Sequence, residues 1–187
     1  MNTERARFEV EPYIEYLKLL ARLQATVRIK VKLDTSDVIQ QTLLRVDAKR
    51  EEFRGHSEEE WVGWLRTILA NTLTELYGAI DTKDCDKVRE QPIQSSLEDS
   101  ASGIKECFTV QQTTRSHKGS RYEQLILLAA ALAQLPFDQR EAVELHHLMG
   151  LTIAEVGQRM DKTRLDAMGL IFLGLKQLRE ILSNEGR

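Results

Sequence analysis

The polar segment 81–120 divides the sequence into two blocks that each carry apolar residues at helical spacing. This segment is rich in Asp, Lys, Ser, Thr, Gln and Gly, and it contains Pro92. A stretch of this length without an apolar period is uncommon inside one compact core and is typical of a connection between domains. We therefore expect a helical domain over 1–80, a linker over 81–120 and a second helical domain over 121–187.

The residue types favour helices in both blocks. Leu, Ala, Glu, Gln and Arg lose little side-chain freedom in a helix, and they dominate over Val and Ile. Only three prolines interrupt the 187 residues, and 42% of the residues are hydrophobic, which is enough for two small cores. The sequence therefore predicts an all-α fold made of two small helical domains.

Three helices are expected in the first block. Apolar residues recur at helical spacing over 10–31 and over 35–53. The third helix begins at a capping box, Ser57 with Glu60, and ends near Gly78. Its apolar stripe consists of Trp61, Trp64, Leu65, Ile68, Leu69, Leu73 and Leu76. We interpret the two tryptophans of this stripe as core residues rather than as platforms for nucleic-acid bases.

The second block predicts four helices, of which the first ends at Pro136. Apolar residues of that first helix are Leu125, Leu128, Ala129, Leu132 and Leu135. Asp138 with Glu141 is expected to cap the second helix, and Gly150 is expected to end it. Because His146 and His147 are adjacent on this helix and so point to different sides, we expect one of them to face the core and the other to lie at the surface.

The last two helices have the spacing of a helix-turn-helix. Thr152 with Glu155 caps a short helix, and Thr163 with Asp166 caps a longer one that reaches about Leu182. The second helix of such a pair lies in the major groove of DNA with its N-terminal residues at the base edges. A helical hairpin without DNA-binding function would have similar spacing.

Two sets of residues resemble the extracytoplasmic-function (ECF) subfamily of sigma-70 RNA polymerase sigma factors. The similarity to region 4 lies in Leu135-Pro136, Arg140-Glu141-Ala142, Leu151-Thr152-Ile153-Ala154-Glu155-Val156, Met160, Thr163 and Arg164. The similarity to region 2 lies in 34–42, Phe53-Arg54-Gly55 and 64–71. Both sets follow in the order and separation of the family. The resemblance implies a protein that binds core RNA polymerase and promoter DNA and directs transcription initiation, with no cofactor, metal or catalytic residue.

The resemblance also implies site residues, by position. Those expected to face the polymerase are Asp37, Gln40, Gln41 and Arg45. Their spacing permits them to share one face of a helix. The alternative interpretation is that this face only contacts solvent. Those expected to contact DNA are Arg66, Asn71 and Glu75 in region 2 and Lys162, Thr163 and Arg164 in region 4. The last three lie at a helix N-terminus, where the helix dipole and unpaired amides favour phosphate.

The last helix departs from the family pattern because Arg164, Lys176 and Arg179 are the only cations in 163–182. Fewer cations weaken phosphate anchoring. Apolar residues at 167, 171, 174, 178 and 181 fill one face, which leaves Met168, Phe172 and Leu175 outside it. We hypothesise that the strip through Met168 and Phe172 docks on the first domain, on a partner such as an anti-sigma factor, or on a second copy.

Several other functions are disfavoured. The net charge of −3 argues against non-specific coating of nucleic acid. No His lies in a metal or triad constellation, and no glycine-rich phosphate loop is present, so we do not expect an enzyme. Cys85 and Cys107 are expected to be free thiols. No apolar run could span a membrane and no signal peptide is recognisable, so we expect a cytoplasmic protein without membrane insertion.

Two other functions stay open at this stage. In one, the first domain senses a signal or dimerises, and only the helix-turn-helix meets DNA, as in one-component transcription regulators. In the other, a sigma-like protein with weakened DNA recognition titrates its partners. Binding to duplex DNA without polymerase separates the first of these from a sigma factor.

Overall fold

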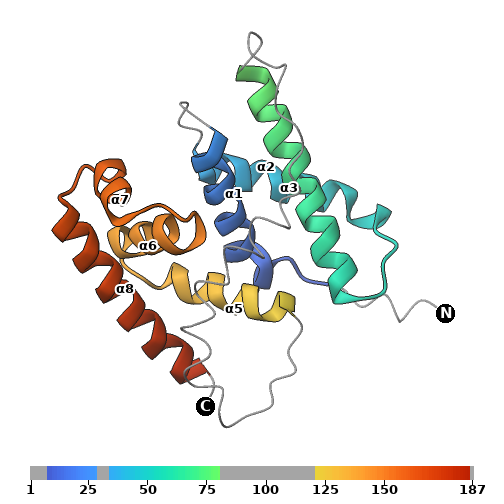
Figure 1. Cartoon of the computed structure of the whole chain (residues 1–187). Coiled ribbons are helices and arrows are strands. Elements are labelled where there is room, and N and C mark those ends of the chain that lie inside the picture. Colours follow the sequence, from blue (N-terminus) through green and yellow to red (C-terminus); the bar gives the residue numbers. More distant parts are fainter. Residues whose placement is uncertain (1–7, 29–33, 81–120, 186–187) are drawn as a thin grey trace. The chain divides into compact units, whose positions relative to one another are not determined.

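The computed structural model describes residues 8–28, 34–80 and 121–185, and every regular element in these ranges is a helix (Figure 1). The all-α prediction is confirmed. The chain divides into two compact units, Met1–Val88 and Arg89–Arg187. No helix in the described ranges is long and apolar enough to cross a membrane.

The predicted linker 81–120 lies outside the described residues, and so do its Cys85 and Cys107. The division into a domain over 1–80, a linker and a domain over 121–187 therefore stays a prediction.

Unit 1 is a bundle of three α-helices with two short 3-10 turns. Its elements are η1 (Glu11–Tyr13), α1 (Ile14–Arg28), α2 (Thr35–Lys49), η2 (Arg50–Glu52) and α3 (Glu58–Ile80). The helix α2 packs on α3, and α1 packs on both. The buried side chains Leu17, Val38 and Leu69 represent the three helices in the core. The expected helices are confirmed, except that α3 continues two residues beyond Gly78.

The N-terminus of α3 has the expected capping box. The Glu60 amide donates to Ser57 Oγ at 3.2 Å, and the Ser57 amide donates to Glu60 Oε2 at 3.2 Å. The His56 amide donates to the same oxygen, at 2.6 Å. These donors hold the pKa of Glu60 below its usual range, with the His56 amide making the largest contribution.

Four aromatic rings meet at this end of unit 1. Trp61 is only 1% exposed, and its ring centroid lies 5.8 Å from that of Phe8, 5.0 Å from that of Phe53 and 4.9 Å from that of Trp64. Trp64 is half-buried. The interpretation of these tryptophans as core is confirmed for Trp61, because a ring so covered cannot stack on a base.

Unit 2 packs three α-helices and one π-helical turn around a fourth α-helix, α8. Its elements are α5 (Arg121–Ala133), α6 (Phe137–Val143), η3 (Glu144–Leu148, the π turn), α7 (Ile153–Arg159) and α8 (Arg164–Glu185). The helix α8 contacts α5, α6 and α7. A core cluster joins α6, η3, α7 and α8 through Ala142, Leu145, Val156, Ala167 and Ile171.

The expected cap at Asp138 is wrong. The helix α6 begins one residue earlier, at Phe137, with Pro136 at the N-cap position and no side-chain cap. Proline at the start of a helix leaves no amide to satisfy and already has an extended ψ there. The Asp138 carboxylate instead forms an ion pair with Lys162, at 3.0 Å from Nζ.

The π turn was not predicted, although its end at Gly150 was. Gly150 has φ +73°, and the Leu151 amide donates to the Leu145 carbonyl at 3.1 Å. The division of the two histidines between core and surface is wrong, since His146 and His147 are both half-buried. A π turn is wider than an α turn and brings adjacent side chains closer in direction, and the two rings lie 4.7 Å apart. Burial, and secondarily His146, hold the pKa of His147 below its usual range.

Candidate functional site

The helices α7 and α8 form the expected helix-turn-helix. Thr152 and Glu155 make a complete capping box on α7. In the turn, Asp161 has φ +55°, and the Lys162 amide donates to the Gly157 carbonyl at 2.8 Å. A Cβ at Gly157 would lie 2.9 Å from the Lys162 carbonyl oxygen, so the glycine permits the close approach of α7 to the turn.

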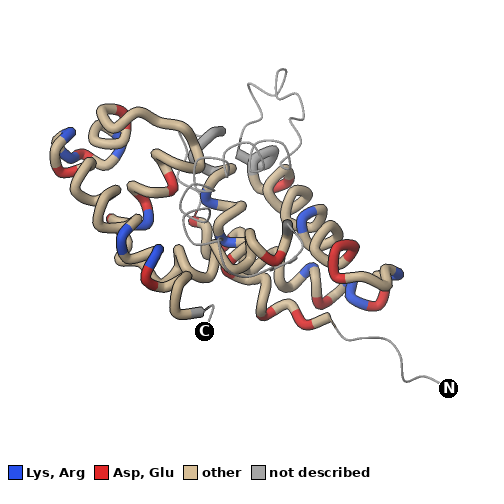
Figure 2. The backbone as a smooth tube through the Cα atoms, turned by 60° about the horizontal axis from the view of Figure 1, so that its bottom comes forward, with Lys and Arg blue, Asp and Glu red and all other residues tan. Residues whose placement is uncertain are grey.

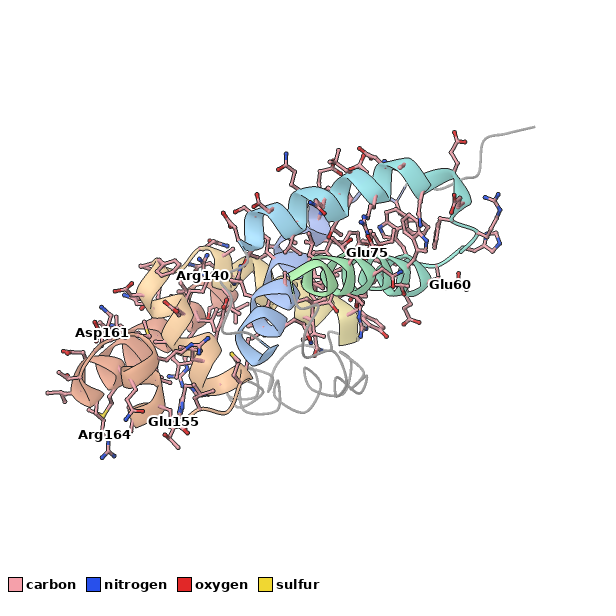
Figure 3. The ribbon with its side chains drawn as sticks, turned by 90° about the horizontal axis from the view of Figure 1, so that it is seen from above. Glu60, Glu75, Arg140, Glu155, Asp161 and Arg164 are labelled. Atoms are coloured by element: carbon pink, nitrogen blue, oxygen red, sulfur yellow. The ribbon has the colours of Figure 1, made fainter. Side chains whose placement is uncertain are left out.

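The three residues predicted to contact DNA in this unit lie together at the start of α8. Thr163 makes the second capping box: its hydroxyl donates to Asp166 at 2.6 Å, and the Asp166 amide donates back to that hydroxyl at 3.1 Å. Lys162 forms an ion pair with Asp138, the residue that the sequence predicted as the cap of α6. Arg164, the first residue of α8, is exposed, and Figure 3 shows it at the same end of the unit as Asp161.

The solvent face of α8 is apolar over its first half. Four large side chains on it are between 49% and 71% exposed: Leu165, Met168, Phe172 and Leu173. Met168 and Phe172, which the apolar period leaves outside the core face, are exposed, whereas Leu175 is partly buried against the core cluster. No charged residue lies between Asp166 and Lys176, which gives α8 a long uncharged middle (Figure 2). With three cations and three anions, α8 offers little attraction for phosphate.

In unit 1, the helix α2 presents a mixed face to solvent. Its buried side holds Val38, Ile39, Thr42 and Val46. Asp37, Gln40 and Gln41 are exposed on the opposite side, as a polymerase-facing set requires. Sequence reasoning missed Leu44, which is 64% exposed among them, seven residues after Asp37 and three after Gln41. Its position off the buried stripe of α2 was the signal that could have identified it.

The fourth residue of that set, Arg45, turns away from the others. It is half-buried and forms an ion pair with Glu75 of α3, which was predicted to contact DNA. This pair lowers the pKa of Glu75, with the hydrogen bond from Arg45 as the largest cause. The structure therefore brings one predicted polymerase residue and one predicted DNA residue together.

The other two predicted DNA residues of α3 lie apart. Asn71 is exposed, whereas Arg66 is half-buried and lies on a different side of the helix, five residues away. With four glutamates and one arginine, α3 carries little positive charge for a phosphate backbone. Within the described residues, no group of three or more His, Cys, Asp or Glu side chains could hold a metal ion.

Comparisons with known proteins bear on this arrangement. Residues 125–178, which include most of α5 and extend far into α8, match the family model "Sigma-70, region 4". No curated protein matches the chain. Among solved structures, the sigma factor RpoE in complex with the anti-sigma factor NepR from Bartonella quintana aligns with 97% of this chain and 98% of its own. Its sequence identity is 21% and its TM-score is 0.36.

The matched residues contain the whole of α6 and α7 and the capped start of α8. The helices α7 and α8 are therefore the helix-turn-helix of a sigma region 4. This excludes the alternative of a helical hairpin that only resembles one in its spacing. Residues 125–178, from α5 into α8, therefore form a sigma-70 region 4 domain.

Proposed function

We propose that the chain is an ECF-type sigma factor of the sigma-70 family that directs transcription initiation. It would bind core RNA polymerase through the exposed face of α2, composed of Asp37, Gln40, Gln41 and Leu44. The observation that carries the proposal is the exposure of Leu44, the only large apolar side chain so exposed in the described part of unit 1. Protein interfaces usually place apolar side chains at their centre and polar side chains at their rim, which is how Leu44 lies among Asp37, Gln40 and Gln41. Arg45 contributes indirectly, by fixing α2 against α3 through Glu75.

Replacing Leu44 with Asp should weaken binding to core polymerase at least tenfold, which corresponds to about 1.4 kcal/mol. The reason is that a carboxylate in the middle of the contact would lose its hydration without gaining a partner. Affinity is measured by titrating labelled sigma factor with purified core enzyme. Leu127→Asp is the matched control, because Leu127 is 50% exposed but lies on α5. Equal affinity of wild type and Leu44→Asp would contradict the proposed face.

For promoter DNA we propose two sets of contacts. Arg66, Asn71 and Glu75 would serve the downstream element, and Lys162, Thr163 and Arg164 the upstream element. Arg164 is the strongest candidate because it is exposed at the N-terminus of α8. Lys162, Thr163 and Glu75 already contact Asp138, Asp166 and Arg45, so DNA would have to share or displace those partners.

Arg164→Ala should weaken promoter binding by the holoenzyme and reduce the slope of log affinity against log salt by about 0.9, the value for one lost phosphate contact. Promoter binding is measured over a series of salt concentrations. Arg164→Lys is the control: it restores the slope if Arg164 binds phosphate, and it leaves a defect for particular promoter sequences if Arg164 reads a base edge. An unchanged affinity and slope in Arg164→Ala would exclude Arg164 from the DNA interface.

A second candidate function is favoured by the apolar solvent face and zero net charge of α8. In it, the protein binds polymerase but recognises promoters weakly, and so titrates partners. Transcription by core enzyme plus this protein on genomic fragments separates the two, because a titrating protein gives no defined start sites.

We further propose that the protein has no enzymatic activity of its own and acts in the cytoplasm, where RNA polymerase works. We also propose that residues 81–120 link a polymerase-binding domain over 1–80 to a DNA-binding domain over 121–187.

A further inference from the structure

We propose that Asp138 of α6 competes with DNA phosphate for Lys162 and thereby limits the affinity of the helix-turn-helix for promoter DNA. The inference rests on the proposed function, because Lys162 is one of the DNA contacts proposed at the start of α8. The Asp138 carboxylate lies 3.0 Å from Lys162 Nζ, and 49% of the Asp138 side chain and 31% of the Lys162 side chain are exposed. Asp138 itself lies on α6, outside the helix-turn-helix.

The backbone of Lys162 is fixed by the turn between α7 and α8. Its amide donates to the Gly157 carbonyl at 2.8 Å, and its own carbonyl oxygen would lie 2.9 Å from a Cβ at Gly157. The preceding residue, Asp161, has φ +55°. Because the backbone is held on both sides of the turn, the rotation of the Lys162 side chain decides whether its ammonium group lies against α6 or reaches a phosphate. Asp138 favours the position against α6.

Two further carboxylates near Lys162 are engaged elsewhere. Asp166 is held in the capping box at the start of α8. Glu141 is half-buried on α6, where burial raises its pKa and so disfavours its charged form. The hydrogen bond that Lys162 donates to Asp138, followed by the charges of the three carboxylates, raises the pKa of Lys162 above its usual range. Lys162 is therefore charged and already paired with Asp138 when DNA approaches.

A phosphate can exchange with this ion pair because both partners are partly exposed. Ion pairs at protein surfaces change an equilibrium by a factor of about five at most. Asp138 therefore lowers the contribution of Lys162 to DNA binding without abolishing it. The carboxylate also repels the phosphate backbone directly, so an experiment has to separate this repulsion from the competition for Lys162.

A double-mutant cycle on the full chain bound to core polymerase separates the two effects. The probe is a promoter fragment mapped by transcription from genomic DNA, and affinity is measured over a series of salt concentrations. Asp138→Asn should strengthen binding about two- to fivefold and steepen the slope of log affinity against log salt by up to about 0.9, since Lys162 becomes available to one phosphate. Lys162→Ala should cost little in the wild-type background and about two- to fivefold more in the Asp138→Asn background.

Asp161→Asn is the matched control, because it removes one carboxylate from the same turn, and asparagine tolerates the φ of +55°. It should strengthen binding less than Asp138→Asn, since it changes only the general repulsion of DNA. Asp138→Asn removes no helix cap, because α6 has no side-chain cap. Circular dichroism should therefore show unchanged helix content in both variants.

The outcomes distinguish this inference from the proposed function. If Lys162→Ala weakens binding equally in the wild-type and Asp138→Asn backgrounds, Asp138 does not compete with DNA and the inference is wrong, whereas Lys162 remains a DNA contact. If Lys162→Ala and Arg164→Ala leave binding unchanged in every background, the proposed contacts at the start of α8 fail, and the inference fails with them.

Discussion

Replacing Gly174 with Ala should destabilise unit 2, whereas the same replacement at Gly169 of the same helix should stabilise it. A Cβ at Gly174 would lie 2.8 Å from Val143 Cγ2 and 3.1 Å from the Gln139 carbonyl oxygen. Val143 is fully buried and β-branched, so it cannot turn aside. Overpacking of this kind costs about 1–3 kcal/mol, which exceeds the gain of about 0.5–1 kcal/mol in helix propensity.

At Gly169 the propensity gain is unopposed, because no atom lies near the added Cβ. Alanine there should raise the free energy of unfolding by about 0.4–1 kcal/mol. The two single-methyl variants should therefore shift the melting temperature of unit 2 in opposite directions, by about 4–8 °C for each kcal/mol.

The two units can be followed separately in this experiment. Both tryptophans of the chain, Trp61 and Trp64, lie in unit 1. Tryptophan fluorescence therefore reports on unit 1, and far-ultraviolet circular dichroism reports on both units. Gly174→Ala should lower the midpoint seen by circular dichroism and leave the fluorescence midpoint in place. A Gly174→Ala variant as stable as wild type would show that α6 and α8 do not approach each other so closely.

The parts of this structure that the sequence predicts are those set by neighbours along the chain. The capping boxes at Ser57, Thr152 and Thr163 each depend on a residue three positions later, and all three form as expected. The apolar period likewise identifies the core faces of α2, α3 and α8, because burial repeats with the helix. The predicted cap at Asp138 does not form, because Pro136 already occupies the N-cap position of α6 and the helix begins at Phe137.

The parts that sequence could not predict depend on contacts between elements. The ion pairs between Arg45 and Glu75 and between Lys162 and Asp138 join residues 30 and 24 positions apart. Nothing in the sequence links these partners. For the candidate site, this means that family resemblance proposes particular residues, whereas only the packing shows which of their side chains are available to a partner. Leu44 is an intermediate case. Its position off the buried stripe of α2 can be read from the sequence, but its exposure also requires that no other helix of unit 1 covers that side.

Trp61→Ala should have the largest effect on stability in the chain. Removing a fully buried large aromatic costs about 3–5 kcal/mol, through lost burial and the cavity left behind. Around Trp61 the rings of Phe8, Phe53 and Trp64 would lose their common neighbour. Because whole domains are stable by only about 5–15 kcal/mol, much of unit 1 should unfold at physiological temperature.

The same substitution distinguishes a core tryptophan from one that stacks on promoter bases. A stacking residue could be removed with loss of DNA binding but without loss of the fold. Trp61→Ala should instead lower the urea midpoint of unit 1, measured by the fluorescence of the remaining Trp64. Trp61→Phe should recover most of the stability. It keeps a six-membered aromatic ring at the site and removes an indole N–H that has no hydrogen-bond partner among the described residues. Trp64→Ala, at a half-buried position, should cost less than Trp61→Ala. If Trp61→Ala kept the wild-type midpoint and lost only promoter binding, the aromatic cluster would be part of the DNA interface and α3 would have to present it to solvent.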